Sequence, residues 1–298
     1  MSTDNDIDAG ADSEWLHAPI SAIREAVTIA IAEDLTPLGD LTSTLLGADP
    51  GQARFAARAP GRIAGTRAAR EALRQVDESI EVSWTIHEGS AVSAGDELAV
   101  VSGPFRSILT AERTALNFLS HLSGIATLTS QYVKAAAEGG SAKIWDTRKT
   151  TPGLRSLQKA AVRAGGGRNH RENLSDWLLI KDNHLANMGI TAAVALGKDR
   201  WPARTIHVEC DGLHQCVEAL EAGADAVLLD NMTPEEVSDC VAEARRIQGD
   251  FARRTLLEVS GGITLATVGA YSATGVDQIS VGAITNSAPV LDIGLDLA

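Results

Sequence analysis

One segment of the chain concentrates positive charge. Residues 148–181 contain eight lysines or arginines against two acids, Glu172 and Asp176, whereas the whole chain has a formal net charge of −13. Two like charges about 4 Å apart repel each other by about 4 kcal/mol where the effective dielectric constant is near 20. Because a bound anion would offset this repulsion, the segment predicts a binding site for a small and highly charged anion.

The cations of this segment suit different anionic groups. Arg148 and Arg171 carry planar guanidinium groups, which bind a carboxylate or a phosphate through two parallel hydrogen bonds. Lys149 and Lys181 carry compact charges that suit phosphate oxygens. The set therefore indicates a small anion that carries carboxylate or phosphate groups.

Two histidines accompany these cations, and they differ in their expected roles. His170 directly precedes Arg171, so its imidazole is well placed to donate a hydrogen bond to a bound carboxylate. We expect a structural role for His184.

Two acids and two glycine-rich turns follow later apolar runs. Glu209 and Asp230 can hold hydroxyl groups, bind Mg²⁺ through its water or stabilise a developing positive charge. Alternatively, these acids are salt-bridge partners of the nearby cations. The turns in "VSGGI" and "VGAIT" favour a phosphate held by backbone N–H groups where a helix begins.

Six short apolar runs recur after residue 142, and helix-like segments separate most of them. This alternation predicts parallel βα units. Polar residues or glycines follow each run, and in a parallel α/β barrel the loops at that end of the strands build the active site. Six strands are fewer than the eight of a complete barrel. The runs are "KIWDTRK", "WLLIKDN", "TIHVEC", "AVLLDN", "LLEVSGG" and "QISVGA".

The N-terminal half has a different pattern. Residues 50–103 alternate with period two around the turn "EGSAVSAGDE", which predicts an antiparallel sheet, and "APISAIREAVTIAIAEDL" and "RAAREALRQVD" predict helices. Apolar spacing predicts a further long helix over 107–137, where the two halves meet. Arg113 lies on another face of that helix, which is either solvated or part of an interface.

Composition limits the class of protein. The 298 residues suggest two domains, and a charge of −13 argues against nonspecific binding to nucleic acid or anionic membranes. The three cysteines show no CxxC spacing and indicate reduced thiols in a cytoplasmic protein. No secretory signal or membrane span is expected, and residues 1–13 are expected to be disordered.

The longest motifs resemble those of the quinolinate phosphoribosyltransferase family, also called carboxylating nicotinate-nucleotide pyrophosphorylases. They are "EDLTPLGDLTS", "GRIAG", "ERTALNFLSHLSGIAT", "DTRKTTPGLR", "KAAVRAGGGRNHRENLSDWLLIKDNH", "HVEC", "LLDNM", "EVSGGI" and "ISVGAITNSAPVLDIGLDL". The resemblance implies an α/β fold with an N-terminal open α/β sandwich domain, 1–114, and an incomplete α/β barrel of six to seven strands, 115–298. It also implies a C-terminal tail that returns to the N-terminal domain, and a homodimer that can assemble further into a hexamer.

The same resemblance implies a reaction and a set of site residues. Quinolinate and phosphoribosyl pyrophosphate would give nicotinate mononucleotide, pyrophosphate and CO₂, with Mg²⁺ as cofactor near Glu209 and Asp230, through water or substrate. Lys149, Glu209 and Asp230 would be catalytic, and Arg113 would reach the active site of the partner subunit. The implied substrate-binding residues are Arg113, Thr147, Arg148, Lys149, His170, Arg171, Lys181, Glu209, Asp230, Ser260, Gly261, Gly262, Val281, Gly282 and Ala283.

Three alternatives remain at this point. Lys149 and Lys181 at strand ends also fit an aldolase that forms a Schiff base. A barrel that binds a sugar phosphate without turnover would use the same cations. A divergent relative associated with molybdenum transport shares the fold, although the intact "RNHR" favours a dicarboxylate substrate.

Overall fold

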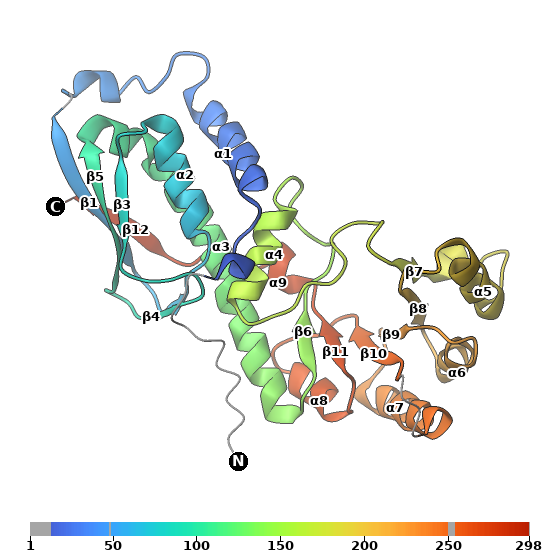
Figure 1. Cartoon of the computed structure of the whole chain (residues 1–298). Coiled ribbons are helices and arrows are strands. Elements are labelled where there is room, and N and C mark those ends of the chain that lie inside the picture. Colours follow the sequence, from blue (N-terminus) through green and yellow to red (C-terminus); the bar gives the residue numbers. More distant parts are fainter. Residues whose placement is uncertain (1–12, 48, 250–253, 298) are drawn as a thin grey trace. The chain divides into compact units, whose positions relative to one another are not determined.

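The computed structural model describes residues 13–47, 49–249 and 254–297, and Figure 1 shows the course of the chain. The disorder expected for residues 1–13 concerns a segment that lies outside the described residues, apart from Ser13. Contacts divide the chain into two compact units. The first consists of Met1–Ser130, Thr150–Gly166 and Ile284–Ala298, and the second of Gln131–Lys149 and Gly167–Ala283.

These units differ from the expected domains, 1–114 and 115–298. Helix α3, Phe105–Gly139, continues through residue 114 and contributes to both units. The sequence holds no glycine or proline from residue 105 to residue 123, so nothing ends the helix near residue 114. The segment Thr150–Gly166, which contains α4, Arg155–Ala164, also belongs to the first unit.

The first unit contains a four-stranded antiparallel sheet with the strand order β12-β1-β5-β3. Alternate side chains along residues 81–87 are exposed, as the period-two pattern predicted. β12 pairs with β1, so the C-terminal strand lies beside a strand from the N-terminal half. The strands are β1, Pro50–Ala57; β3, Glu81–Trp84; β5, Glu97–Pro104; and β12, Ile293–Leu297.

Two helices of this unit were predicted, namely α1, Ile20–Leu35, and α2, Thr66–Val76, and they contact each other. The predicted turn between β3 and β5 contains an additional strand, β4, Ala91–Val92, which pairs with β2, Gly61–Arg62. Short 3-10 helices η1, Glu14–Leu16, and η2, Ser43–Leu45, complete the N-terminal half.

The second unit contains a six-stranded, wholly parallel sheet with the order β6-β11-β10-β9-β8-β7. Each predicted apolar run forms one of these strands. Within the described residues the edge strands β6 and β7 do not pair with each other, so the sheet stays open. The predicted fold class is therefore confirmed, with six strands. They are β6, Lys143–Trp145; β7, Leu178–Ile180; β8, Ile206–Cys210; β9, Ala226–Asp230; β10, Leu256–Ser260; and β11, Gln278–Ser280.

Helices connect these strands (Figure 1). β8, β9 and β10 are mostly buried along their length, as expected for parallel strands covered on both faces. The start of α7 illustrates local control, because Thr233 and Glu236 form a reciprocal capping box around Pro234. The helices are α5, Ile190–Arg200; α6, Leu213–Glu221; α7, Pro234–Gln248; α8, Val268–Ala273; the 3-10 helix η3, Asp182–His184; and α9, Ala283–Asn286.

Two further expectations concern the cysteines and the membrane. Cys210, Cys216 and Cys240 are free thiols, and all three are buried in the second unit. Over the described parts of the chain, none of the helices combines the length and the apolar character that crossing a membrane requires.

Candidate active site

A cavity of about 330 Å³ in the second unit gathers residues from the carboxyl ends of the parallel strands. Nine of the site residues predicted from the sequence line it. The end of β6 supplies three of them, the loop before β7 supplies two, and the ends of β7 to β10 supply one each. These nine residues are Thr147, Arg148, Lys149, His170, Arg171, Lys181, Glu209, Asp230 and Ser260.

The cations of this pocket differ in exposure. Lys149 is exposed, whereas Arg171 is only 8% exposed. Burial lowers the pKa of the Arg171 guanidinium, and the positive charge of Arg148 lowers it further. Burial and the neighbouring cation both disfavour the charged form of Arg171. An anion bound beside Arg171 would therefore stabilise its positive charge.

A buried carboxylate holds the loop that carries His170 and Arg171. Asp146, which is fully buried, accepts a hydrogen bond from the backbone N–H of His170 at 2.8 Å and from Nδ2 of Asn169 at 2.7 Å. The loop also forms an isolated parallel bridge between Arg168 and Trp145. Asp146, which sequence reasoning did not single out, therefore fixes the "RNHR" segment along the edge of β6.

The two predicted carboxylates lie on neighbouring strands. Lys181 Nζ pairs with Glu209 Oε2, and Asn231 Nδ2 donates to Asp230 Oδ2 at 2.6 Å. Burial raises the pKa of Asp230, and the negative charge of Glu209 raises it further, whereas Lys181 and Lys149 act in the opposite direction. The salt-bridge role weighed from the sequence thus applies to Glu209, while Asp230 remains accessible from the cavity.

The glycine turns border the same region, but only one of them leads directly into a helix. Gly261 and Gly262 have φ angles of +98° and +61°, and α8 begins only at Val268. Gly282 directly precedes α9, and a Cβ built on it would lie 2.9 Å from Lys149 Cδ. The expected link from turn to helix therefore holds for Gly282 and was wrong for the turn after β10.

The remaining predicted residues have varied surroundings. Val281 is buried, and its backbone N–H donates to Trp145 O at 2.9 Å, so any contact it makes with a ligand involves the main chain. Ala283 is the first residue of α9 and is half-buried. Arg113 belongs to the first unit, where it is exposed on α3. His184 Nδ1 accepts the backbone N–H of Lys181 at 3.0 Å, which agrees with the structural role expected for it.

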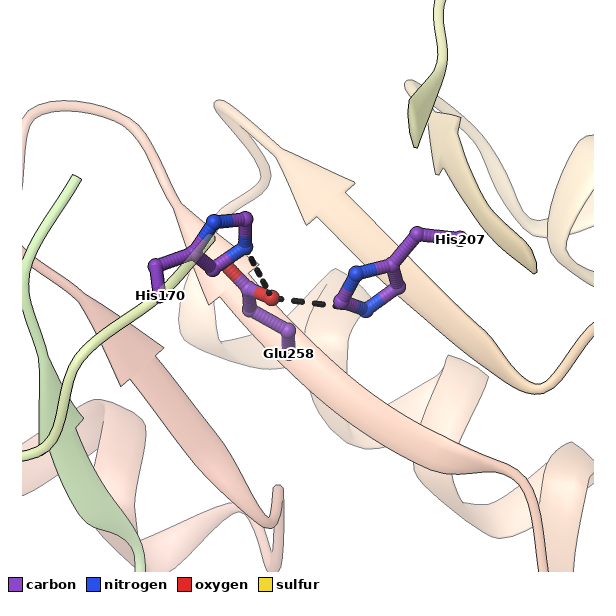
Figure 2. Close-up of side chains that lie close together, drawn as sticks. All are labelled: His170, His207 and Glu258. Atoms are coloured by element: carbon purple, nitrogen blue, oxygen red, sulfur yellow. Dashed lines mark hydrogen bonds and ion pairs between the residues drawn. The ribbon is translucent and has the colours of Figure 1, made fainter. Parts of the chain in front are cut away.

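Sequence reasoning missed a buried cluster behind this surface. Figure 2 shows the Glu258 carboxylate of β10 between the imidazoles of His170 and His207. Glu258 Oε2 lies 3.2 Å from His170 Nε2, which forms a hydrogen bond with it, and 3.4 Å from His207 Nε2, which does not have hydrogen-bond geometry. The sequence signal was a charged residue in the middle of the apolar run "LLEVS".

The pKa values in this cluster shift strongly. Burial lowers the pKa of His207 to about 4, the negative charge of Glu258 opposes this shift, and the positive charge of Arg171 adds to it, so His207 is neutral at pH 7. Burial alone would raise the pKa of Glu258, but the hydrogen bond with His170, together with the interactions of His207 and Ser280, outweighs burial, and the net pKa is lowered. The cluster therefore contains an ionised carboxylate that is fully buried.

Among the residues that the structure describes, two groups of side chains could hold a metal. The donor atoms of His170, His207 and Glu258 all lie within 4.8 Å of one another, as in sites for transition metals. Glu209 and Asp230 instead offer carboxylate oxygens to the cavity, which suits Mg²⁺, an ion that keeps several waters and binds through one or two carboxylates together with substrate phosphates.

Comparisons with family models cover nearly the whole chain. Residues 40–123 match the model described as the quinolinate phosphoribosyl transferase N-terminal domain, and residues 125–296 match the C-terminal domain of the same family. The chain is 41% identical over 281 residues to a carboxylating nicotinate-nucleotide pyrophosphorylase of Mycobacterium leprae, covering 93% of this chain and 97% of that protein. It is 40% identical to a probable enzyme of the same name in Bacillus subtilis, over 87% of this chain and 88% of that protein.

Solved structures give the same result. The nicotinate-nucleotide pyrophosphorylase of Francisella tularensis superposes with a TM-score of 0.90 at 38% identity, covering 96% of this chain and 99% of that one. The enzyme of the same name from Ehrlichia chaffeensis gives a TM-score of 0.84 at 35% identity, covering 92% and 98%. The chain therefore belongs to the quinolinate phosphoribosyltransferase family, with both of its domains.

Proposed function

We propose that this protein transfers the phosphoribosyl group of phosphoribosyl pyrophosphate to quinolinate with decarboxylation, which gives nicotinate mononucleotide, pyrophosphate and CO₂. This is a pentosyltransferase reaction of de novo NAD biosynthesis. One observation carries the proposal: in a member of this family, a single cavity is lined by four cations and by carboxylates at the ends of parallel strands.

The dicarboxylate would bind on the arginine side of the cavity. Arg148, His170 and Arg171 line it together, and the pKa of Arg171 is lowered by burial and by a neighbouring cation, which favours binding of a dianion there. Planar guanidinium groups match carboxylate geometry. We infer that these three residues hold the two carboxylates of quinolinate.

The sugar phosphate would bind on the side of the acids and glycines. Glu209 and Asp230 would accept hydrogen bonds from the ribose hydroxyls, while Lys149 and Lys181 would contact pyrophosphate or carboxylate oxygens. Backbone N–H groups of the last two strand ends would hold the 5′-phosphate. The residues proposed to hold this phosphate are Ser260, Gly261, Gly262, Gly282 and Ala283, while Thr147 and Val281 remain predicted substrate-binding residues without an assigned group.

The reaction needs no covalent enzyme intermediate. The bond from C1′ to pyrophosphate breaks and its electron pair leaves with the pyrophosphate, while the quinolinate nitrogen bonds to C1′. Glu209 and Asp230 would stabilise the positive charge that develops on the ribose. The resulting pyridinium stabilises the electron pair left on C2 when CO₂ departs, and C2 then takes a proton. The enzyme residues orient both substrates and match their charges.

Magnesium fits this arrangement as a cofactor. Lys181 already pairs with Glu209, so Glu209 and Asp230 would hold Mg²⁺ through water or through the substrate phosphates. When bound, Mg²⁺ would neutralise charge on the leaving pyrophosphate. The three buried thiols are consistent with action in the reducing cytoplasm.

We also propose that the active protein is a homodimer, which can assemble further into a hexamer, and that Arg113 reaches the partner's active site. Arg113 is an exposed cation on α3, and quinolinate carries two negative charges for it to contact. Mixing the inactive variants Arg113→Ala and Lys149→Ala would then restore one intact site per mixed dimer. If subunits exchange at random, half of the dimers are mixed, and each mixed dimer has one intact site of two. For parent variants that are fully inactive, dimer symmetry therefore predicts recovery of about a quarter of wild-type activity. No recovery, despite demonstrated subunit exchange, would contradict the shared site.

Release of labelled CO₂ from carboxyl-labelled quinolinate tests the function directly. We expect release that depends on phosphoribosyl pyrophosphate and that Lys149→Ala abolishes without changing the melting temperature. An imine intermediate would require Lys181 to leave its pair with Glu209, so we expect no adduct on borohydride treatment. Binding of the substrates without CO₂ release would contradict the proposed function and support a sensing protein.

A further inference from the structure

The Glu258 carboxylate forms part of the floor of the candidate active site. Its residue is fully buried, yet it lines the same cavity as His170 and Arg171. A buried carboxylate is stable only where donors face it. His170 Nε2 forms a hydrogen bond with Oε2 at 3.2 Å, and the side chain of Ser280 also interacts with the carboxylate and lowers its pKa. Glu258 and His170 therefore depend on each other.

Other contacts fix the plane of the His170 ring. It stacks on His207 with ring centroids 5.7 Å apart and planes 8° apart. Its ring centroid also lies 4.9 Å from that of Trp177 and 6.5 Å from that of Trp145, with ring planes 64° and 84° apart, in edge-to-face arrangements. Its backbone N–H is held by Asp146. These aromatic contacts fix the plane of the imidazole, but they do not determine which of its two nitrogens faces Glu258. The hydrogen bond to Glu258 makes that selection, because it assigns Nε2 to the floor of the pocket.

We propose that Glu258 is a positioning residue of the quinolinate subsite, which fixes the orientation of the His170 imidazole before the dicarboxylate binds. This inference rests on the proposed function. It assigns Glu258 no direct contact with the substrate. Loss of the carboxylate would therefore weaken binding of quinolinate selectively and would leave the phosphoribosyl pyrophosphate side unaffected.

The surroundings favour a shared proton over a metal in this cluster. Arg148, Lys149 and Arg171 line the same cavity, and the pKa of Arg171 is already lowered by burial and by the charge of Arg148. A divalent cation bound to His170 and Glu258 would add positive charge to a side of the cavity where these cations already repel one another. A hydrogen bond satisfies the carboxylate without that addition.

Two variants of Glu258 separate positioning from general stability. Glu258→Leu removes the acceptor, and a hydrogen bond to a charged group is worth enough for its loss to raise the KM for quinolinate about tenfold or more. The KM for phosphoribosyl pyrophosphate should change by less than about twofold, because this substrate does not depend on the His170 orientation. That change is well below the tenfold expected for quinolinate when the hydrogen bond is lost. Glu258→Gln keeps an acceptor oxygen of the same reach, so it should restore most of the quinolinate affinity.

Glu88 provides a matched control. Its carboxylate is also buried, and it accepts hydrogen bonds from Gly65 and Thr66 in the first unit. Glu88→Gln should lower the melting temperature without a selective change in the KM for quinolinate. If Glu258→Leu raises both KM values equally, or leaves the KM for quinolinate unchanged, the positioning role is wrong. It is also wrong if a zinc chelator abolishes wild-type activity and Zn²⁺, but not Mg²⁺, restores it.

A measurement on the wild-type protein covers the case in which Glu258→Leu does not fold. Long-range ¹H–¹⁵N spectra report the protonated nitrogen of each histidine, and His170→Asn identifies the signal of His170. We expect a proton on Nε2 that exchanges slowly with water. An unprotonated Nε2, or rapid exchange, overturns the inference. Because this readout needs no turnover, it stays decisive even if the wild-type protein releases no CO₂, a result that would count against the proposed function alone.

Discussion

Replacing Arg171 with methionine should separate activity from stability. Arg171 is 8% exposed and lines the cavity together with Arg148. Methionine keeps an unbranched side chain of comparable length but removes the positive charge. Removing one partner of a buried charge pair typically costs about 2–5 kcal/mol. Since about 1.4 kcal/mol corresponds to a factor of ten, kcat/KM for quinolinate should fall by about 30-fold to several thousand-fold.

The stability of the protein without substrate should not fall in parallel. Burial and the charge of Arg148 lower the pKa of Arg171, so the charged guanidinium is disfavoured where it lies. Arg171→Met removes that unfavourable term, and the melting temperature should stay the same or rise. Quinolinate should raise the melting temperature of the wild-type protein, because a ligand stabilises the state that binds it, but it should not raise that of Arg171→Met.

Labelled CO₂ release and scanning calorimetry measure the two effects on the same samples. Arg204→Met is a matched control, because Arg204 is exposed in the same unit and its guanidinium donates a hydrogen bond to the carbonyl oxygen of Asp176 at 3.3 Å. It should leave kcat/KM within about twofold of wild type, as expected for a surface substitution. The reasoning is refuted if Arg171→Met retains kcat/KM within a few-fold of wild type, or if it loses activity together with a lower melting temperature.

Two further predictions concern stability. A Cβ at Gly261, which has a φ of +98°, would lie 2.2 Å from Asn231 Oδ1, whereas a Cβ at Gly262 would meet no atom within 4 Å. In urea titrations, Gly261→Ala should therefore lower the free energy of unfolding by about 1–3 kcal/mol. Gly262→Ala should lower it by only about 1 kcal/mol, through backbone strain. Burial lowers the pKa of His121, whose ring nitrogen lies 2.8 Å from Gln158 Nε2. Protonation therefore favours the unfolded chain, the free energy of unfolding should fall as the pH drops below about 6.5, and His121→Gln should reduce this dependence.

The six strands of the second unit could be predicted because each is a short apolar run that ends in a polar residue or a glycine. A parallel strand covered on both faces must be apolar along its length, and its end is where the chain returns to solvent. Residues at these ends, such as Lys181, Glu209 and Asp230, could thus be assigned to one edge of the sheet and do line one cavity. The pattern contains this information because all the strands run in the same direction.

The floor of the cavity was missed, although period two contains a signal for it. Residues two positions apart on a strand point to the same face. Glu258 precedes Ser260 by two positions, and His207 precedes Glu209 by two. Residues that lie deeper in the cavity can therefore be identified as those two positions before the residue at each strand end. The sequence does not show that β8 and β10, which are separated by β9, bring the side chains of His207 and Glu258 together.

The boundary between the units could not be predicted for a different reason. Helical periodicity continues along α3 past residue 114, and a continuous helix gives no local sign of where its packing partners change. The segment Thr150–Gly166 joins the first unit through contacts that are distant in sequence. For example, the Nε atom of Arg163 donates to Trp15 O at 2.6 Å. Such pairings follow from tertiary packing and leave no periodic pattern.

The charges that line the cavity limit what one chain can bind by itself. Four cations, Arg148, Lys149, Arg171 and Lys181, face three carboxylates, Glu209, Asp230 and Glu258, and the pair between Lys181 and Glu209 already cancels two of these charges. Quinolinate brings two negative charges, and phosphoribosyl pyrophosphate brings several more. Because desolvated anions need matching cations, the cavity needs additional positive charge when both substrates are bound. The magnesium ion and the Arg113 side chain of a second subunit, both part of the function proposed above, would supply this charge.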